Sequence, residues 1–403
     1  MDNIILIDNE EHWNALLPLS YTRPISELRV GIMTIRAKWE YLLNSSASYI
    51  TKSYLAEKYP FTLKEDNLII NSTIIPTPYI IDKVKDLELN KAVVWNDTLI
   101  AARMDKNQFN SLQKDSGFEE IPGSNIAHQD EKLLQLKRPS DIFRLNGEAM
   151  SLDFGLLTKN KKSAAIPDHV TTVNPSNIFL EEGVDLSHCI LNASTGPIYL
   201  SKDAQVMDGA IIRGPFAVMN GAVVKMGAKI YGPTTLGPFC KVGGEVNNVV
   251  FQAFSSKAHD GFLGNSAIGE WCNIGADTNS SNLKNNYAEV KLFDYNAERF
   301  TPTGLQFCGL IMGDHSKCGI NTMFNTGTVV GVACNLFGSG FPRNFVPSFS
   351  WGGARGYSTF KLEKVYEVAE KVMARRAYEL TEADKTILGH IFYFSSKFRN
   401  WEK

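Results

Sequence analysis

The chain has 403 residues, and its 41 Lys and Arg residues nearly balance its 43 Asp and Glu residues, giving a formal net charge of -2. This balance, without a basic stripe, argues against nucleic acid and an anionic membrane surface as partners. No apolar run approaches the roughly 20 residues that cross a bilayer, and Met1–Trp13 lacks the basic start of a signal peptide. We therefore expect a cytoplasmic protein.

The first part of the chain alternates short apolar runs with helical patterns, which is typical of an α/β domain. Strands are predicted at Ile4–Ile7, Leu68–Ile70, Tyr79–Ile81 and Ala92–Trp95. A helix is predicted over Ile32–Leu43, and Leu136–Met150 reads as an extended segment followed by a helix start. We place a Rossmann-like domain over residues 1–158, with the basic stretch Lys159–Lys162 as a linker.

A different periodicity begins near residue 178, where aliphatic residues recur every six positions. The series is Ile178, Val184 and Ile190, then Leu200, Val206, Ile212, Val218, Val224, Ile230, Leu236 and Val242. Small residues precede most of these by two positions: Ala204, Ala210, Ala222, Ala228, Thr234 and Cys240. A helix would spread such positions around its axis. A period of six instead predicts a left-handed parallel β-helix, with aliphatic side chains inward and small residues at the corners.

We place the β-helix over residues 166–350. Ile268 and Ile274 extend the pattern, the polar stretch Lys257–Lys291 interrupts it, and it then resumes at Met312, Cys318, Phe324, Val330 and Leu336. Residues 351–403 form a predicted helical tail. Phe360–Glu379 is amphipathic, and Thr381 with Asp384 three residues later is typical of the start of a second helix that runs to about Phe398. Packing on the solenoid explains this apolar face better than membrane binding does.

The cysteines show no C-x-x-C pair that would indicate a metal or redox site. They are Cys189, Cys240, Cys272, Cys308, Cys318 and Cys334. Several fall in register with the six-residue repeat. We therefore expect reduced cysteines that act as small core residues.

Motifs in the interrupted region carry a family resemblance. GNSAIGEWCNIGA (264–276), SNLK (281–284), EVK (289–291) and GDHSKCGIN (313–321) follow one another. In order and spacing they resemble the two-domain GlmU-like proteins, which combine a sugar-1-phosphate nucleotidyltransferase with an amino-sugar-1-phosphate N-acetyltransferase. The likeness is greater to the archaeal-type branch. The resemblance implies hexapeptide-repeat acyltransferase chemistry and assembly as a homotrimer.

The resemblance also implies roles for individual residues. His259 stands where the family has the general base that deprotonates the amine of the sugar, a task suited to histidine. Ala276 stands where the coil meets acetyl-CoA. The positions implied for binding the sugar phosphate and placing the acetyl group are Asn273, Asn282 and Lys291, with Phe262 where the family has a tyrosine. A lone histidine held by a loop hydrogen bond, and asparagines that only form turns, are the simpler alternatives.

The N-terminal half departs from the family pattern. Leu17–Gly31 resembles the nucleotidyltransferase segment and Asp141–Phe143 resembles the W-D-I-F segment, but Asp8–Leu16 contains no glycine to bring backbone N–H groups to a nucleotide phosphate. Ile25 replaces the family lysine. The remaining candidates are Arg23, Arg29 and Lys38 for phosphate, and Asp97 for Mg²⁺.

The predicted function is transfer of an acetyl group from acetyl-CoA to an amino-sugar 1-phosphate, with glucosamine 1-phosphate as the first candidate. This reaction belongs to nucleotide-sugar biosynthesis of the UDP-GlcNAc type, which serves the cell envelope. One alternative places the main activity in the N-terminal domain, as a sugar-1-phosphate uridylyl- or thymidylyltransferase that uses UTP or dTTP with Mg²⁺. The other is a non-catalytic sugar-nucleotide-binding scaffold.

Overall fold

The computed structural model describes residues 3–115 and 121–402. The chain forms two compact units built from non-contiguous segments. Unit 1 comprises residues 1–13, 23–28 and 33–137, and unit 2 comprises residues 14–22, 29–32 and 138–403. The domain bounds expected from the sequence stay a prediction. The α/β part, the β-helix and the helical tail are all present, so the predicted fold class is confirmed.

Unit 1 is built on a mixed sheet in the order β2-β1-β3-β5-β4-β6. Its strands are β1 (Ile4–Ile7), β2 (Ala47–Ile50), β3 (Asp66–Asn71), β4 (Lys91–Trp95), β5 (Thr98–Asp105) and β6 (Gly123–Asn125). The helices in this part of the chain are α1 (Glu10–Ala15), α2 (Ile35–Leu43), α3 (Pro78–Lys85) and α4 (Lys106–Asp115). Strands β2, β1 and β3 are parallel, so their carboxyl ends meet at one edge of the sheet.

The predicted strand at Tyr79–Ile81 is wrong, because these residues lie in α3. The side chain of Thr77 accepts a hydrogen bond from the N–H of Ile80, and Pro78 occupies the first turn. A threonine cap followed by proline is a strong helix start, and it prevails over a short apolar run. The predicted helix is confirmed over Ile35–Leu43, where Thr34 is the N-cap.

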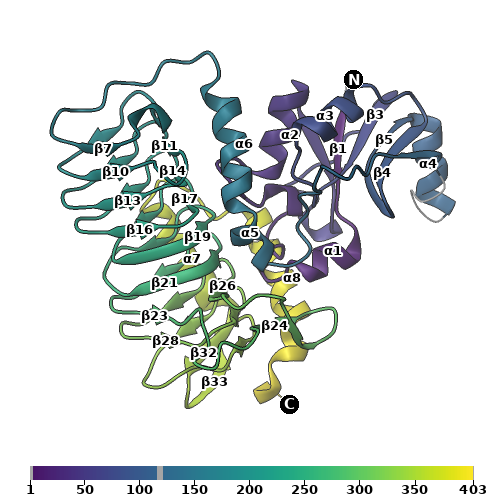
Figure 1. The fold of residues 1–403 in the computed structure, drawn as a ribbon. Helices are drawn as coiled ribbons and strands as arrows, with labels where there is room; N and C mark the ends of the chain where they lie inside the picture. The colour runs from purple at the N-terminus through teal and green to yellow at the C-terminus, as the bar shows by residue number, and fades with distance from the viewer. Residues whose placement is uncertain (1–2, 116–120, 403) are drawn as a thin grey trace. The chain divides into compact units, whose positions relative to one another are not determined.

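Unit 2 is dominated by a left-handed parallel β-helix, visible as the stack of coils from β7 to β33 in Figure 1. One sheet contains β9 (Asp185–Leu186), β12 (Gln205–Val206), β15 (Val223–Val224), β18 (Lys241–Val242), β20 (Ser256–Lys257), β22 (Asn273–Ile274), β27 (Lys317–Cys318), β30 (Asn335–Leu336), β32 (Ser350–Gly353) and β33 (Gly356–Thr359). The other contains β7 (Thr171–Val173), β8 (Ile178–Leu180), β10 (Ile190–Asn192), β11 (Ile198–Leu200), β13 (Ile211–Arg213), β14 (Phe216–Val218), β16 (Lys229–Tyr231), β17 (Thr234–Leu236), β19 (Glu245–Phe251), β21 (Phe262–Ile268), β23 (Asn279–Ser280), β26 (Leu310–Met312), β28 (Met323–Phe324), β29 (Thr328–Val330) and β31 (Phe345–Val346).

The core of the β-helix confirms the six-residue pattern from Leu200 onward. The aliphatic residues from Leu200 to Val242 are buried, as are the small residues that precede them. The first coil departs from the prediction: Leu180 and Leu186, and not Ile178 and Val184, pair with Leu200 and Val206. Ile190 is 37% exposed, and Leu191 takes the inward position. Leu191 follows the preceding inward residue, Leu186, by five positions instead of six, so the six-residue count fails in the first coil. Each of the six cysteines is a buried free thiol, as predicted.

The interruption of the β-helix begins later than predicted. Residues up to Ser280 still supply coil strands, including β20, β21 and β22. The excursion is residues 281–309, and it contains the antiparallel hairpin of β24 (Lys291–Asp294) and β25 (Arg299–Pro302). Asparagine-rich turns at coil corners look like a loop in sequence, because a corner and a loop require the same left-handed conformations.

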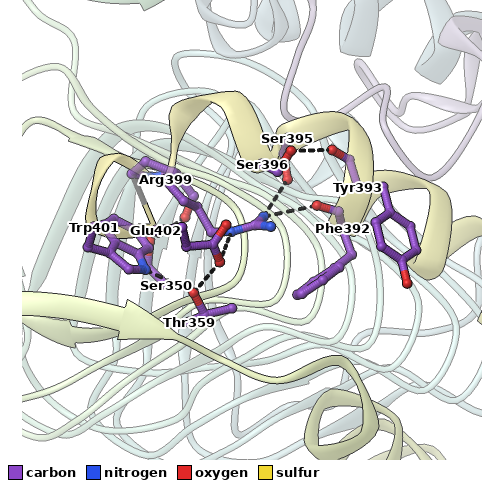
Figure 2. A network of polar contacts seen from close by, with 10 residues as sticks. Ser350, Thr359, Phe392, Tyr393, Ser395, Ser396, Arg399, Trp401 and Glu402 are labelled. Carbon is purple, nitrogen blue, oxygen red and sulfur yellow. Dashed lines mark hydrogen bonds and ion pairs between the residues drawn. The ribbon is translucent and has the colours of Figure 1, made fainter.

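The helical tail consists of α7 (Leu362–Ala374) and α8 (Glu382–Phe394), followed by short 3₁₀ turns. The predicted capping box of Thr381 and Asp384 is present. Figure 2 shows how the end of the tail is held: the buried guanidinium of Arg399 donates to the Phe392 carbonyl at 3.0 Å and to the Glu402 carboxylate at 2.8 Å. In the described part of the chain, no helix is long and apolar enough to span a membrane.

Two further helices lie before the coils, α5 (Ser140–Arg144) and α6 (Asn146–Thr158). Met150 of α6 packs with Ile32, Phe179 and Tyr199 in a small apolar cluster, so α6 covers an outer face of the early coils. Helix α5 packs against β19 and β21. The segment that resembles W-D-I-F, Asp141–Phe143, therefore contacts the strand that follows His259.

Candidate active site

His259 lies in the turn of residues 258–261 that joins β20 to β21 at a corner of the β-helix, here called the His259 turn. Neighbouring corners enclose its backbone on both sides. A Cβ on Gly244, in the coil before, would meet the His259 carbonyl oxygen at 2.9 Å. The N–H of Asp277, in the coil after, donates to the Asp260 carbonyl at 2.9 Å. His259 itself is exposed, so the fold presents a histidine on a tightly enclosed turn.

Phe262 and Asn282 meet directly after this turn. A Cβ on Gly264 would lie 2.7 Å from Cζ of Phe262 and 2.6 Å from Nδ2 of Asn282. The absence of a side chain at Gly264 thus makes room for both groups. The Asn282 amide also donates to Oδ1 of Asn265 at 2.7 Å, which fixes its orientation. Two of the predicted substrate-binding residues therefore share one place on the coils.

Asn273 and Ala276 lie one coil further along. Asn273 is exposed and pairs with Ser256 in the parallel ladder of β20 and β22. The same register places Ala276 against the His259 turn. The carbonyl of Ala276 accepts from the N–H of Asn321, in the next coil, at 2.8 Å. The structure therefore brings Asn273 and Ala276 onto the coil adjacent to His259.

Lys291 is placed apart from these residues in the coil stack. It is exposed and begins β24 in the excursion. Its backbone lies against a later coil, since a Cβ on Gly327 would meet the Lys291 carbonyl oxygen at 2.5 Å. The other histidine of these motifs, His315, sits at a coil corner with φ 60° and stacks on Trp271 at 6.4 Å between ring centroids.

The cations predicted to bind phosphate occupy different surroundings. Arg23 and Lys38 are buried in unit 1. Arg29 belongs to unit 2, where its Nε donates to the Gln252 carbonyl at 3.4 Å and its guanidinium also donates to the Ile32 carbonyl. The side-chain amide of Gln252 in turn pairs with the Arg29 backbone. These contacts attach the Arg29 segment to the β-helix.

Asp97, the predicted magnesium ligand, is exposed in the turn between β4 and β5. Among residues 3–115 and 121–402, no group of three or more His, Cys, Asp or Glu side chains is arranged to hold a metal ion. A lone carboxylate does not form a Mg²⁺ site, because the ion prefers octahedral oxygen ligands from carboxylates and substrate phosphates together. The protein side chains alone thus do not fit a resident Mg²⁺.

Asp8 was not singled out in the sequence, although it follows β1 at the carboxyl edge of the parallel strands. Its carboxylate accepts from the Thr51 hydroxyl at 2.7 Å and from the Ile25 N–H at 3.2 Å. Burial raises the pKa of this carboxyl from 3.8 to about 6. The sequence does carry an indication of this residue: an acid directly after a buried strand lies where open α/β sheets bind ligands.

Comparison with known proteins finds similarity to the N-terminal part of the chain and to longer stretches of it. Residues 4–162 match a family model described as sugar nucleotidyl transferase. The bifunctional protein GlmU of Synechococcus elongatus is 24% identical over 243 residues, which span 54% of this chain and 49% of that protein. The bifunctional protein GlmU of Methanocaldococcus jannaschii is 33% identical over 90 residues, covering 22% of this chain and 21% of that protein. The chain is thus similar to GlmU proteins over part of its length.

The chain spans about half the length of the Synechococcus relative that it matches. Among solved structures, the polySia-specific acetyltransferase NeuO aligns with 15% identity and a TM-score of 0.26, covering 47% of this chain and 85% of that chain.

Proposed function

We propose that this protein transfers the acetyl group of acetyl-CoA to the amine of an amino-sugar 1-phosphate, with glucosamine 1-phosphate as the first substrate to test. The observation that carries the proposal is the exposed His259 on an enclosed turn, followed directly by Phe262, whose side chain lies over Gly264 together with that of Asn282. An exposed histidine whose backbone is held on both sides suits a general base that must meet a substrate in one orientation.

In the proposed reaction the amine nitrogen attacks the thioester carbonyl carbon while the His259 imidazole takes the proton from that nitrogen. The new C–N bond forms, the C–S bond breaks, and the thiol of CoA leaves with a proton. Asn282, Asn273 and Lys291 are proposed to bind the sugar phosphate, and Ala276 to lie beside the acetyl-CoA. A phenyl ring at Phe262 supplies an apolar wall, where a hydroxyl would supply a hydrogen bond to the sugar or the developing oxyanion.

The test measures thiol release from acetyl-CoA with a panel of amino-sugar phosphates. His259→Ala should lower kcat by roughly 100-fold or more with an unchanged Tm, the usual effect of losing a positioned general base. His188→Ala is the matched control, because His188 is another exposed histidine on a β-helix turn, far along the chain from the motifs. Turnover by His259→Ala at the wild-type rate would remove His259 from the mechanism.

A second candidate is nucleotidyl transfer by the N-terminal part, favoured by its match to the sugar nucleotidyl transferase family model. In this reaction UTP or dTTP would enter as its magnesium complex and pyrophosphate would be released. The position of Asp8 counts against it, since a carboxylate at the carboxyl edge repels phosphate. Pyrophosphate release with a sugar 1-phosphate is the deciding measurement. Tight sugar-nucleotide binding without turnover in either assay would instead favour a binding scaffold.

A further inference from the structure

A lysine stands inside the β-helix where the ladder of inward side chains is otherwise apolar. Lys257 ends β20 and pairs with Val242, in the column of residues that fills the core along one sheet. The other members of the column are Leu186, Val206, Val224, Val242, Ile274, Cys318 and Leu336. Lys257 is only 1% exposed, which makes it one of the largest fully buried side chains in the described residues. An ammonium in this place requires hydrogen bonds to offset its lost hydration.

Those hydrogen bonds go to the backbone of the candidate active site. Nζ of Lys257 donates to the His259 carbonyl at 2.9 Å and to the Gly243 carbonyl at 3.0 Å. Gly243 precedes Gly244, the glycine that lies against the His259 turn. The Lys257 ammonium therefore hydrogen-bonds to the backbone of two successive corners from inside the β-helix. The nearby groups with an electrostatic effect on it are Asp260, Asp277 and Cys318.

The two contacts explain how the turn keeps its shape. The coil before and the coil after already restrict it, because a Cβ on Gly261 would meet the Thr278 carbonyl oxygen at 2.2 Å. These restraints come from the neighbouring corners and not from the interior of the β-helix. The carbonyl of His259 faces the core, and Lys257 provides its donor there. The direction of this carbonyl fixes the backbone of His259, and hence the direction in which the exposed imidazole leaves the coil.

We propose that Lys257 is a positioning residue that holds the backbone of His259 from inside the β-helix, so that the imidazole is presented to the amine of the substrate. The proposal rests on the proposed acetyl transfer, which it deepens by naming a residue that touches no substrate. It also explains why a costly buried ammonium stands in a ladder where an aliphatic residue would pack better.

The test compares Lys257→Met with Leu336→Met. Both place methionine in the same column, but Leu336 lies in a later coil, where it pairs with Cys318 and Gly352. Lys257→Met should lower kcat by about 100-fold, the effect of misplacing a catalytic group by about 1 Å, while KM for the amino sugar changes less than threefold and Tm stays equal or rises. Leu336→Met should keep kcat within threefold. A kcat of Lys257→Met within threefold of wild type overturns the proposal.

Hydrogen exchange followed by mass spectrometry supplies a readout that needs no turnover. In Lys257→Met the peptide covering residues 258–262 should exchange at least tenfold faster than in wild type, with no change in the later coils. Lys257→Gln, which keeps a donor, should lie between the two and serves if the methionine variant folds poorly. If wild type acetylates no amino sugar, the proposed function fails, and the exchange result alone then decides whether Lys257 holds the turn. Unchanged exchange in both variants overturns that role.

Discussion

Two ionisable side chains, one fully buried and one half-buried, combine a stability cost with a place at a candidate site. Lys257 lies inside the β-helix behind His259, and Asp8 lies at the carboxyl edge of the unit 1 sheet. In both cases burial shifts the pKa toward the neutral form. Folding stability must therefore change with pH near each shifted value, which makes both groups accessible to experiment without a substrate.

For Lys257, burial lowers the pKa from 10.5 to about 8. The unfolded chain therefore binds the proton more tightly than the folded chain, and this residue disfavours folding most strongly below pH 8. The cost disappears as pH rises from 8 to above 10. Between pH 7 and 9.5, the free energy of unfolding of wild type should rise by about 2 kcal/mol relative to Lys257→Met. Urea denaturation of both proteins at the two pH values measures this, and a constant difference would contradict it.

For Asp8 the pKa is raised, whereas for Lys257 it is lowered. The folded-state pKa of about 6 exceeds the ordinary value of 3.8, so the folded chain binds the proton more tightly. Stability from this group is complete below pH 4 and is lost as pH rises through 6. Because the side chain is partly exposed, wild type should lose about 1 to 2 kcal/mol relative to Asp8→Asn between pH 4 and pH 7. Parallel stability curves for the two proteins would rule out the shifted carboxyl.

At the scale of elements, the β-helix could be predicted further than the α/β part. Each inward position must be filled by a side chain that stacks on its equivalent one coil away, so Val206 and Val224 repeat a pattern that one sequence displays. The sheet of unit 1 has no such repetition. The helix at Pro78–Lys85 was therefore mistaken for a strand, because three apolar residues fit either element.

The candidate site could be predicted as a set of motifs but not as an arrangement. The sequence indicated His259, Phe262 and Asn282, and the structure brings the last two together over Gly264. Their roles stay predictions. Lys257 was missed because a lysine in an aliphatic series looks like a break in the pattern, and only the fold reveals where its ammonium is satisfied. Asp8 was missed because Ile25 and Thr51, its partners, are distant in sequence.

The corner that carries His259 depends on Gly261, which has φ +114° and a carbonyl oxygen of the next coil in the space for a Cβ. Gly261→Ala should therefore both strain the backbone and separate two coils, and lower the free energy of unfolding by about 2 to 4 kcal/mol. Gly304→Ala is the control, because Gly304 also has positive φ but has open space at its Cβ position. Its cost should stay near 1 kcal/mol. Equal Tm values for the two variants would show that the coil contact is not restrictive.

The end of the tail offers a further test. Arg399 is buried and is satisfied by the Phe392 carbonyl, the Ser395 hydroxyl and the Glu402 carboxylate, as Figure 2 shows. Arg399→Met would leave these acceptors without their donor, a loss expected to cost about 3 kcal/mol. The tail should then be cut earlier by trypsin than in wild type, while Lys364→Met, which removes an exposed ion pair, should leave the cleavage rate unchanged. Unaltered cleavage after Arg399→Met would contradict this role.

At the scale of the whole molecule, one outer face of the β-helix carries apolar side chains without cover in the single chain. They stand on neighbouring strands of one sheet: Val173 at 43%, Ile190 at 37%, Ile211 at 50% and Tyr231 at 36% exposure. A groove of about 580 Å³ lies among them, lined in part by Ile190, Ile211 and Tyr231. Contiguous exposed apolar surface of this kind indicates a protein interface. We therefore expect this face to be covered by a second copy in the homotrimer that the family resemblance implies.

Ile211→Glu tests this expectation, because a carboxylate at the most exposed of these positions would have to be buried without a partner on assembly. Light scattering should report about three times the 44.8 kDa of one chain for wild type and a value near one chain for Ile211→Glu. Met226→Glu is the matched control, since Met226 is also exposed and apolar but lies at a corner turn. A trimer that survives Ile211→Glu would place the interface on another face. A monomeric wild type would contradict the expected trimer.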